Sequence, residues 1–416
     1  MKYIYWMRND LRTQDNEVLE WASHQRGEML ILYTLPSDIH EWGPHRRGFL
    51  KQTLDDLEKN LKNYNLNLHI TARSIVDFLP ELFEVQKFTH LLFSKEHAFN
   101  ERRDEQKIKQ IAESLGIKVE EFDQSSLLKE TELAFDIPQL PKIFTEFKNT
   151  LGATFKVSLP VELPISNLHS LPLPKEKINW GELSNHSWFE GGESKGLERI
   201  QAFIWESQSI LHYNDTRNGM MNLNDSSKFS PWLALGAISA RQIYHEVKKF
   251  ELQHGENKSC YWLIYELLWR DYFKFYAKKY GARIFLADGI QQNPNKVFKN
   301  DEAAFKKWTM GETGEPFIDA HMKELLLTGW MSNRGRQNVS NYLAKTMNIN
   351  WTWGANWFEK NLIDYDPCQN WGNWNYTSGV GADPRDRLFN PKSQAKAYDP
   401  DGIYQQKWLG QRKDHE

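Results

Sequence analysis

A carboxylate lies among aromatic rings in a helical stretch of the chain's second half. If residues 260–273 form a helix, one face carries four side chains, Trp262, Glu266, Trp269 and Phe273. A buried carboxylate costs free energy unless it is paired or takes part in chemistry. Glu266 therefore either acts on something held between flat rings or is neutralised by Arg270, four residues further on. The helix alone leaves both interpretations open.

Three hydroxyls and a lysine precede a predicted helix that starts near Pro231. They belong to the run Ser226, Ser227, Lys228, Phe229 and Ser230. Exposed amides at a helix N-terminus attract phosphate, so this run favours a phosphate-binding site. The alternative is that Ser230 only caps the helix ahead of Pro231.

Two further runs are rich in polar and aromatic side chains. The first follows a glycine and holds Asn333, Arg334, Arg336 and Gln337, and guanidinium groups suit carboxylates or phosphates. The second, residues 364–376, alternates acids, amides and rings with little aliphatic content, which indicates a site for a flat polar ligand. An exposed basic turn and an irregular structural loop are the respective alternatives.

Composition places the chain among ordinary globular proteins. Its 416 residues are 40% hydrophobic and 26% charged, which predicts two domains. No apolar run is long enough to span a membrane, and the N-terminus lacks a signal-peptide pattern. Cys260 and Cys368 are the only cysteines, so neither a disulfide framework nor a four-cysteine zinc site is expected. We expect a cytoplasmic protein without a metal.

Charge and tryptophan are unevenly distributed. The net charge is −3, yet residues 241–345 carry 17 Lys/Arg against 12 Asp/Glu, and eleven of the 17 tryptophans lie between Trp232 and Trp408. A local basic patch could meet a polyanion, although a solvated helical surface has the same composition. Clustered indoles suggest a flat ligand, base stacking or electron transfer, or simply a bulky helical core.

The order of patterns predicts an α/β domain, a linker and an all-α domain. In residues 1–128, strands are expected at Tyr3–Met7, Met29–Thr34, Leu66–Thr71, His90–Ser94 and Lys118–Phe122, and helices at Arg46–Tyr64, Ser74–Gln86 and Glu101–Leu115. This alternation favours a doubly wound parallel sheet, without a G-x-G-x-x-G fingerprint. Six prolines predict that residues 129–190 form an extended linker with one short helix near Lys142–Asn149. The pattern of residues 191–416 predicts helices throughout.

The four runs, in this order and spacing, resemble the photolyase/cryptochrome family. The likeness extends over the whole chain and includes Arg8-Asn9-Asp10-Leu11-Arg12 after the first strand. The motifs Ser-Asn-Arg-Gly-Arg-Gln and Asn-Trp-Gly-Asn-Trp-Asn-Tyr are similar to those of the DASH branch. The resemblance implies FAD bound without a covalent link, in a U-shape, in the helical domain. The residues implied to hold FAD are Tyr213, Ser226 to Ser230, Arg270, Asn333, Arg336 in an ion pair with Asp364, Asp366 at the flavin's polar edge and Asn370 at its N5.

The same resemblance implies a deoxyribodipyrimidine photolyase, which splits cyclobutane pyrimidine dimers in UV-damaged DNA under light. Glu266 would hydrogen-bond the dimer, Trp269 would stack on it, and Tyr376 would form the other wall. Gln337 stands where (6-4) photolyases have histidine, so (6-4) repair is not expected. Because Tyr376 offers a smaller face than tryptophan, single-stranded or looped DNA is the expected substrate form.

The family's electron path to flavin is a row of three tryptophans. Trp374 matches the inner one and Trp351 the middle one, but the outer position falls at Phe298, and phenylalanine is a poor electron donor. The nearby indoles that could replace it are Trp353, Trp357 and Trp371. Glu101 matches the acid that grips a folate antenna, 5,10-methenyltetrahydrofolate, in related proteins.

Two other functions remain open. The first is a blue-light signalling cryptochrome, which usually adds a long C-terminal tail; the chain ends at Glu416 without one and keeps Glu266 and Trp269, so repair is favoured. The second is an electron-transfer flavoprotein that never meets DNA. We expect a monomer that does not associate with membranes.

Overall fold

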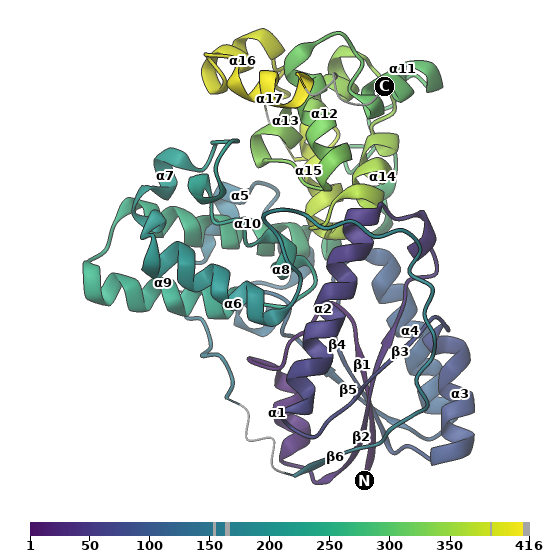
Figure 1. Ribbon diagram of the computed structural model, residues 1–416. Coiled ribbons are helices and arrows are strands. Elements are labelled where there is room, and N and C mark those ends of the chain that lie inside the picture. The colour runs from purple at the N-terminus through teal and green to yellow at the C-terminus, as the bar shows by residue number, and fades with distance from the viewer. Residues whose placement is uncertain (153–154, 163–166, 383–384, 411–416) are drawn as a thin grey trace.

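The N-terminal part of the computed structural model is a parallel sheet in the order β3-β2-β1-β4-β5 (Figure 1). The structure describes residues 1–152, 155–162, 167–382 and 385–410. The strands are β1 (Lys2–Met7), β2 (Gly27–Thr34), β3 (Leu68–Thr71), β4 (His90–Ser94) and β5 (Lys118–Phe122). All five predicted strands are present, and the order reverses on the two sides of β1, so the prediction of a doubly wound parallel sheet is confirmed.

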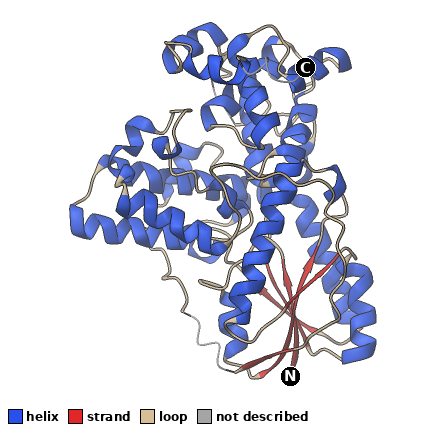
Figure 2. Ribbon diagram, in the orientation of Figure 1, coloured by secondary structure: helices blue, strands red, loops and turns tan. Residues whose placement is uncertain are grey.

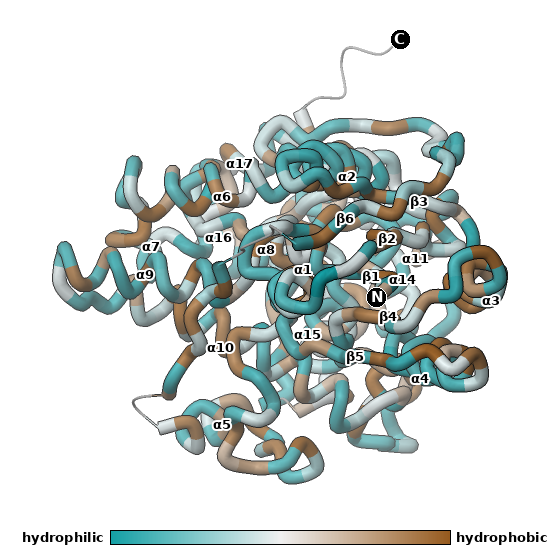
Figure 3. The backbone as a smooth tube through the Cα atoms, turned by 90° about the horizontal axis from the view of Figure 1, so that it is seen from below, coloured by the Kyte–Doolittle hydropathy of each residue, from teal (hydrophilic) through white to brown (hydrophobic). Residues whose placement is uncertain are grey.

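Helices cover both faces of this sheet because alternate strand residues point to opposite sides. On one face Tyr3 and Tyr5 pack with α1 (Glu17–Ser23) and α2 (Pro44–Lys62). On the other, Ile4 packs with α3 (Ile75–Gln86) and α4 (Phe99–Ser114). Figure 3 shows β1 and β2 between α2 on one side and α4 on the other. Three of these helices were predicted; the short α1 was not.

The predicted linker differs from the expectation in one respect. Its short helix is present as α5 (Phe144–Thr150), but β6 (Leu168–Ser170) pairs in parallel with the start of β2 and extends the sheet. A strand of three residues between prolines is too short to show alternation, so the sequence pattern did not reveal it. Two 3₁₀ turns, Glu130–Glu132 and Ile137–Gln139, precede α5.

The C-terminal part is helical, as predicted, in the portion that the structure describes (Figure 2). Its helices are α6 (Glu193–Gln201), α7 (Tyr213–Thr216), α8 (Ser230–Ala234), α9 (Ala240–His254), α10 (Lys258–Tyr280), α11 (Glu302–Met310), α12 (Pro316–Thr328), α13 (Asn333–Asn341), α14 (Trp351–Asn361), α15 (Pro367–Ser378), α16 (Pro391–Tyr398) and α17 (Ile403–Leu409). Among the described residues, no helix is both long and apolar enough to cross a membrane.

A buried ion pair joins the two parts. Arg241 at the start of α9 donates to both carboxylate oxygens of Asp15, at 3.1 and 2.8 Å, and also pairs with Glu17. The Arg241 and Asp15 side chains are 2% and 0% exposed. Charges removed from water to this degree depend on one another, because each would be costly to bury alone.

Replacing Arg241 with methionine tests this junction. The variant leaves the buried Asp15 carboxylate without its arginine, so the free energy of unfolding should fall by about 3–5 kcal/mol, measured by urea denaturation. Lys249→Met on the same helix is the matched control, because the exposed Lys249–Glu246 pair contributes about 1 kcal/mol or less. Equal losses in the two variants would contradict a junction that depends on Arg241.

Candidate functional site

The four polar and aromatic runs meet around one cavity of about 950 Å³. Its size is at the upper end of the range for ligand sites, roughly 300–1,000 Å³. The residues predicted to hold FAD or the dimer all line it, as does Trp374. Of the other predicted residues, Trp351 is buried and does not line this cavity, and Glu101 lines a second, smaller cavity.

Lys228 is a buried cation at the edge of the large cavity. It is 4% exposed, and burial lowers the pKa of its ammonium group to about 8. The ammonium nitrogen lies 4.2 Å from the ring centre of Trp330, so an aromatic face stabilises the charge where water does not. A cation held in this way suits an anionic group of a ligand.

Ser230 does not cap α8, so the alternative interpretation of that run is wrong. Its hydroxyl donates to Asp364 over 2.6 Å, across 134 positions of sequence. Asp364 also accepts from Arg336 Nη2 at 2.9 and 2.8 Å, which is the ion pair that the resemblance implied. The Arg336 Nε donates to the carbonyl of Met331. The guanidinium is therefore fixed at the cavity wall; its contact with FAD stays a prediction.

Asp366 and Asn370 are held by the first turn of α15. The Asp366 carboxylate caps this helix by accepting from the amides of Cys368 and Gln369 at 2.8 and 3.0 Å. Asn370 donates from its side-chain amide to the carbonyl of Ala355 at 3.0 Å, which fixes the orientation of the amide. Both side chains are nearly buried and line the cavity, so their positions are set before any ligand arrives.

Glu266 is paired with Arg217, and not with Arg270 as the alternative interpretation required. Arg270 instead donates to the carbonyls of Ser125 and Leu233 at 2.8 and 3.2 Å. Loss of hydration raises the pKa of the Glu266 carboxyl, and Arg217 acts in the opposite direction. The predicted helix face is confirmed, since all four of its side chains line the cavity.

Trp269 is stacked on Phe144 of α5, with ring centres 3.8 Å apart and planes 9° from parallel. One face of the indole is therefore covered, and only the opposite face can stack on a base. Tyr376 meets Trp269 at 6.4 Å and 83°, so the two rings form adjoining walls. Gln337 accepts from Arg334 at 3.0 Å.

Sequence reasoning missed Phe144, Arg217 and the part played by Arg334. Arg334 lay in a run already singled out, and its basic type was the only signal. Phe144 and Arg217 contact residues far away in the chain, which local periodicity does not reveal.

The cavity is more basic than the whole chain. Among the described residues that line it, seven side chains are basic and three are acidic: Arg217, Lys228, Arg270, Arg334, Arg336, Arg385 and Arg387 against Glu266, Asp364 and Asp366. The net charge of −3 for the chain therefore does not describe this surface. Local excess of this kind attracts phosphate groups.

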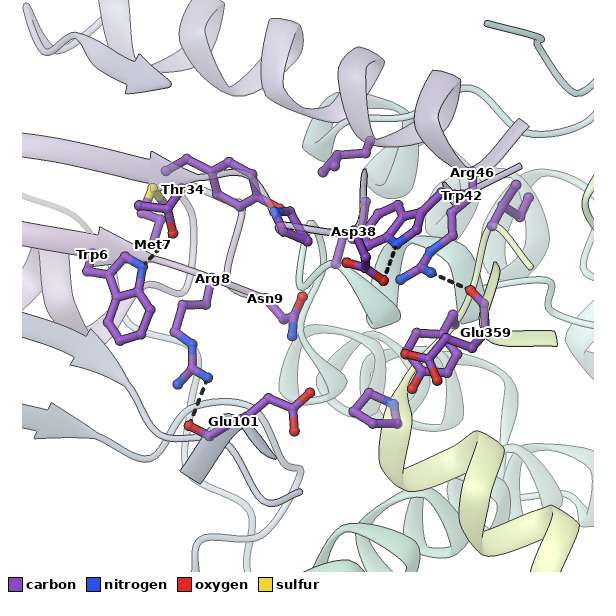
Figure 4. Close-up of a pocket in the computed structure, with 17 residues that line it drawn as sticks. Trp6, Met7, Arg8, Asn9, Thr34, Asp38, Trp42, Arg46, Glu101 and Glu359 are labelled. Atoms are coloured by element: carbon purple, nitrogen blue, oxygen red, sulfur yellow. Dashed lines mark hydrogen bonds between the residues drawn. The ribbon is translucent and has the colours of Figure 1, made fainter. Parts of the chain in front are cut away.

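The second cavity, of about 240 Å³, lies where β1 and β2 end (Figure 4). The carboxyl ends of the parallel strands are the edge of the sheet at which doubly wound folds bind ligands. Figure 4 shows the Glu101 carboxylate directed into it, and one of its oxygens is buried without a hydrogen-bond partner among the described residues. Burial raises the pKa of Glu101 to about 7. Arg46 lies opposite, over the ring of Trp42, and burial lowers its pKa to about 10.

The two tryptophans of the predicted electron path are buried, and the first of them, Trp374, lines the large cavity. Trp374 and Trp351 are 2% and 0% exposed, and Trp351 meets Trp371 with ring centres 5.7 Å apart. Phe298 precedes a bridge between Lys299 and Ile349, which places it beside the start of α14. Within the described ranges, no cluster of His, Cys, Asp or Glu could hold a metal ion.

A parallel-sheet domain followed by helices around a large polar and aromatic cavity defines a photolyase-type flavoprotein. Residues 3–165 match the family described as DNA photolyase, and residues 262–416 match the FAD binding domain of DNA photolyase. The cryptochrome DASH of Synechocystis sp. is 39% identical over 431 residues, covering 99% of this chain and 88% of the relative. That of Xenopus laevis is 39% identical, covering 98% and 82%.

The chain belongs to the photolyase/cryptochrome family. The crystal structure of the Synechocystis sp. cryptochrome superposes with a TM-score of 0.94 at 38% identity, covering 99% of this chain and 89% of that one. FAD is the cofactor. The cavity fits it in size and chemistry, because a buried cation, Lys228, and two buried polar side chains, Asp366 and Asn370, line it.

Glu101→Gln tests the charge of the small cavity. The pKa of Glu101 is raised from 4.5 to about 7. Between these two pH values the folded state therefore binds more protons than the unfolded chain. Stability therefore falls as the pH rises through this window. Glutamine cannot ionise, so the variant should match the parent in acid and be more stable by about 2–3 kcal/mol near neutrality and above.

Urea unfolding on either side of the window, in preparations of equal chromophore content, measures this difference. Glu113→Gln, at an exposed position of the same helix, is the control. The same pH dependence in both variants would contradict the raised pKa of Glu101.

Proposed function

We propose that the protein repairs cyclobutane pyrimidine dimers under light, preferably in single-stranded or looped DNA. The observation that carries this proposal is the position of Glu266 beside Trp269 and Tyr376, in the wall of the cavity that suits FAD. A carboxyl group and two aromatic walls are what a flat, uncharged lesion requires. The basic lining of the same cavity supports contact with the phosphates on either side of the lesion.

When bound and reduced, FAD would supply under light the electron that splits the dimer. Trp269 receives the dimer on its free face, and Tyr376 closes the adjoining side. Glu266 then acts on the dimer's carbonyl oxygens. Burial raises the pKa of the Glu266 carboxyl while Arg217 lowers it, and the carboxyl would form a hydrogen bond at the oxygen where negative charge arrives. Arg217 holds the carboxyl in place until the lesion enters.

The remaining predicted residues position the cofactor. Tyr213 and the run Ser226 to Ser230 would hold its phosphate and ribose portions, and Arg270 and Asn333 would line its cavity. Arg336 with Asp364, Asp366 and Asn370 would hold the flavin ring. Trp374 and Trp351 would supply electrons to oxidised flavin. Gln337, held by Arg334, contacts the lesion side and offers no imidazole for (6-4) repair.

We further propose that the small cavity holds a folate antenna, 5,10-methenyltetrahydrofolate, against Glu101. The support is a buried carboxyl oxygen without a partner among the described residues, in a cavity with aromatic walls at Trp42 and Tyr365. Such a carboxyl can pair with the amino and ring N–H groups of a pterin. A monomeric, cytoplasmic protein stays our expectation.

A blue-light photoreceptor is the second candidate function, because the relatives in the comparison are named cryptochromes. It would use the same flavin without turnover of DNA. The two functions differ in whether Glu266 matters.

Glu266→Ala separates them. Loss of the hydrogen bond to the charged dimer should lower the quantum yield of repair about tenfold, equivalent to roughly 1.4 kcal/mol, while FAD content stays unchanged. Glu266→Gln is the matched control, since its amide keeps a donor and should retain most of the yield. Normal repair in Glu266→Ala would contradict this role, and the absence of repair in the parent protein would favour the photoreceptor.

The aromatic walls of Trp269 and Tyr376 favour single-stranded DNA over duplex DNA as the substrate. Flipping a dimer out of a duplex costs a few kcal/mol, and stacking returns about 1–3 kcal/mol per base, less on a phenol than on an indole. Since Phe144 covers one face of Trp269, the lesion gains a single indole face. We expect tighter binding and faster repair in a single-stranded oligonucleotide than in the matching duplex at equal salt. Tyr376→Trp should narrow the gap; equal rates in the parent would refute the preference.

A further inference from the structure

A single buried amide, that of Asn341, ties together two parts of the wall of the large cavity. Asn341 is the last residue of α13 and is 2% exposed. Its Nδ2 donates to the carbonyls of Thr377 and Arg387, at 3.2 and 2.9 Å. Its Oδ1 accepts from the backbone amide of Phe389 at 2.9 Å. Because both N–H groups are engaged within the protein, this side chain holds neighbouring backbone and offers no donor to a ligand.

Residues 385–389, which we call the basic segment, bring two arginines into the cavity wall. Arg385, Arg387 and Phe389 line the large cavity, and the segment belongs to no helix or strand. Arg387 is exposed, and among the described residues its guanidinium makes no hydrogen bond or ion pair. A cation at the edge of a cavity that the protein does not itself neutralise is available to a phosphate.

The backbone of the basic segment is held in a turn that residues with a side chain seldom adopt. Asp386 has a φ of 41°, in the left-handed region. Its carboxylate pairs with Lys345 at 2.7 Å and with Lys296 at 3.3 Å. Lys345 also donates to the carbonyl of Arg387 at 2.6 Å, and Lys296 to that of Gly379 at 2.7 Å. Such a conformation persists where surrounding contacts fix it, so the position of the basic segment is set by the fold.

The same contacts join the basic segment to the wall on which the lesion would stack. Thr377 directly follows Tyr376, and Gly379 caps the end of α15. Asn341 holds one carbonyl on each side, so it fixes the distance between Arg387 and Tyr376. A base and the phosphates beside it are joined by a short covalent chain. A phosphate contact therefore assists a stacked base only when the protein holds the cation at the matching distance.

We propose that Asn341 is a positioning residue for damaged DNA, which holds Arg387 at the distance from Tyr376 that a phosphate beside the lesion requires; this rests on the proposed repair function. Without Asn341 the basic segment keeps its charges, but the guanidinium samples more positions. Ordering it on a phosphate then costs conformational entropy. The loss falls on the binding of damaged DNA and not on the splitting of a dimer that is already bound.

The salt dependence of DNA binding tests this role. The FAD-loaded protein is titrated in the dark, at several salt concentrations, with a fluorescent single-stranded oligonucleotide that carries one thymine dimer. The slope of the logarithm of the binding constant against that of the salt concentration counts the neutralised phosphates, at about 0.7 per phosphate in a single strand. A change that only destabilises the fold leaves this slope unaltered.

The variants are Asn341→Ala, Arg387→Gln, the two combined, and Asn361→Ala as the matched control. Asn361 is the last residue of α14, as Asn341 is of α13. Its side chain donates to the carbonyl of Trp357 in its own helix, at 2.8 Å, and it does not line the large cavity. FAD content and urea unfolding check each variant.

We expect Asn341→Ala to weaken binding about tenfold at low salt and to reduce the slope by about 0.7, the loss of one phosphate contact. Arg387→Gln should do the same. The combined variant should be no weaker than either single one, because both remove the same contact. Asn361→Ala should bind as the parent does, and the quantum yield of Asn341→Ala on saturating DNA should equal that of the parent.

Weaker binding with an unchanged slope, or additive losses in the combined variant, would show that Asn341 does not act through Arg387. Parent-like binding by Arg387→Gln would also overturn the proposal. Should Asn341→Ala lose FAD or unfold, Asn341→Ser decides. Its single donor cannot serve both carbonyls, so an unchanged slope there refutes the role. Absence of repair by the parent protein would refute the repair function instead, since the slopes and the additivity are measured without turnover.

Discussion

The contact of α10 with the segment after β5 fixes the geometry of the large cavity. Asp271 is 0% exposed and accepts from the backbone amides of Leu127 and Leu128 at 2.9 and 2.8 Å. Lys274, one turn on, donates to the carbonyl of Ser125 at 3.0 Å. Buried polar groups that satisfy one another in this way hold a helix in one register. Because Glu266 lies on the same helix, its position in the wall of the cavity follows from the junction between the two parts of the molecule.

Burial gives the two cavities their chemistry by shifting the charge of their side chains. It raises the pKa of Glu266 and of Glu101, and it lowers the pKa of Lys228. In each case burial disfavours the charged form of the group: the ionised carboxylate of the two glutamates and the ammonium of Lys228. The two proposed ligands, a dimer and a pterin, are flat groups without charge, and partial exclusion of water gives each cavity a carboxyl group suited to such a partner.

The sequence predicts well what depends on local pattern. The five strands, three of the covering helices, the helix face around Glu266 and the residues of the cavity wall were all foreseen, the last through resemblance to a family. The pairs that set the charge of the site were not. Arg217 and Glu266 are separated by 49 positions, and Ser230 and Asp364 by 134. Periodicity reports neighbours three or four residues apart, so Arg270 was the natural partner to consider for Glu266, and helix capping the natural use of Ser230. Only the three-dimensional packing decides between them.

Tyr365 shows how closely the two cavities depend on each other. It lines both, and it stands between Asp364 and Asp366, which face the larger one. Arg46 from the sheet domain lies 4.6 Å from its ring centre, and the N–H of Trp371 donates to its hydroxyl at 3.3 Å. A ligand that changed the position of Arg46 in the small cavity would press on the same three-residue segment that carries both aspartates. The sheet domain therefore contributes to the flavin site through packing, although none of the side chains proposed to hold the flavin belongs to it.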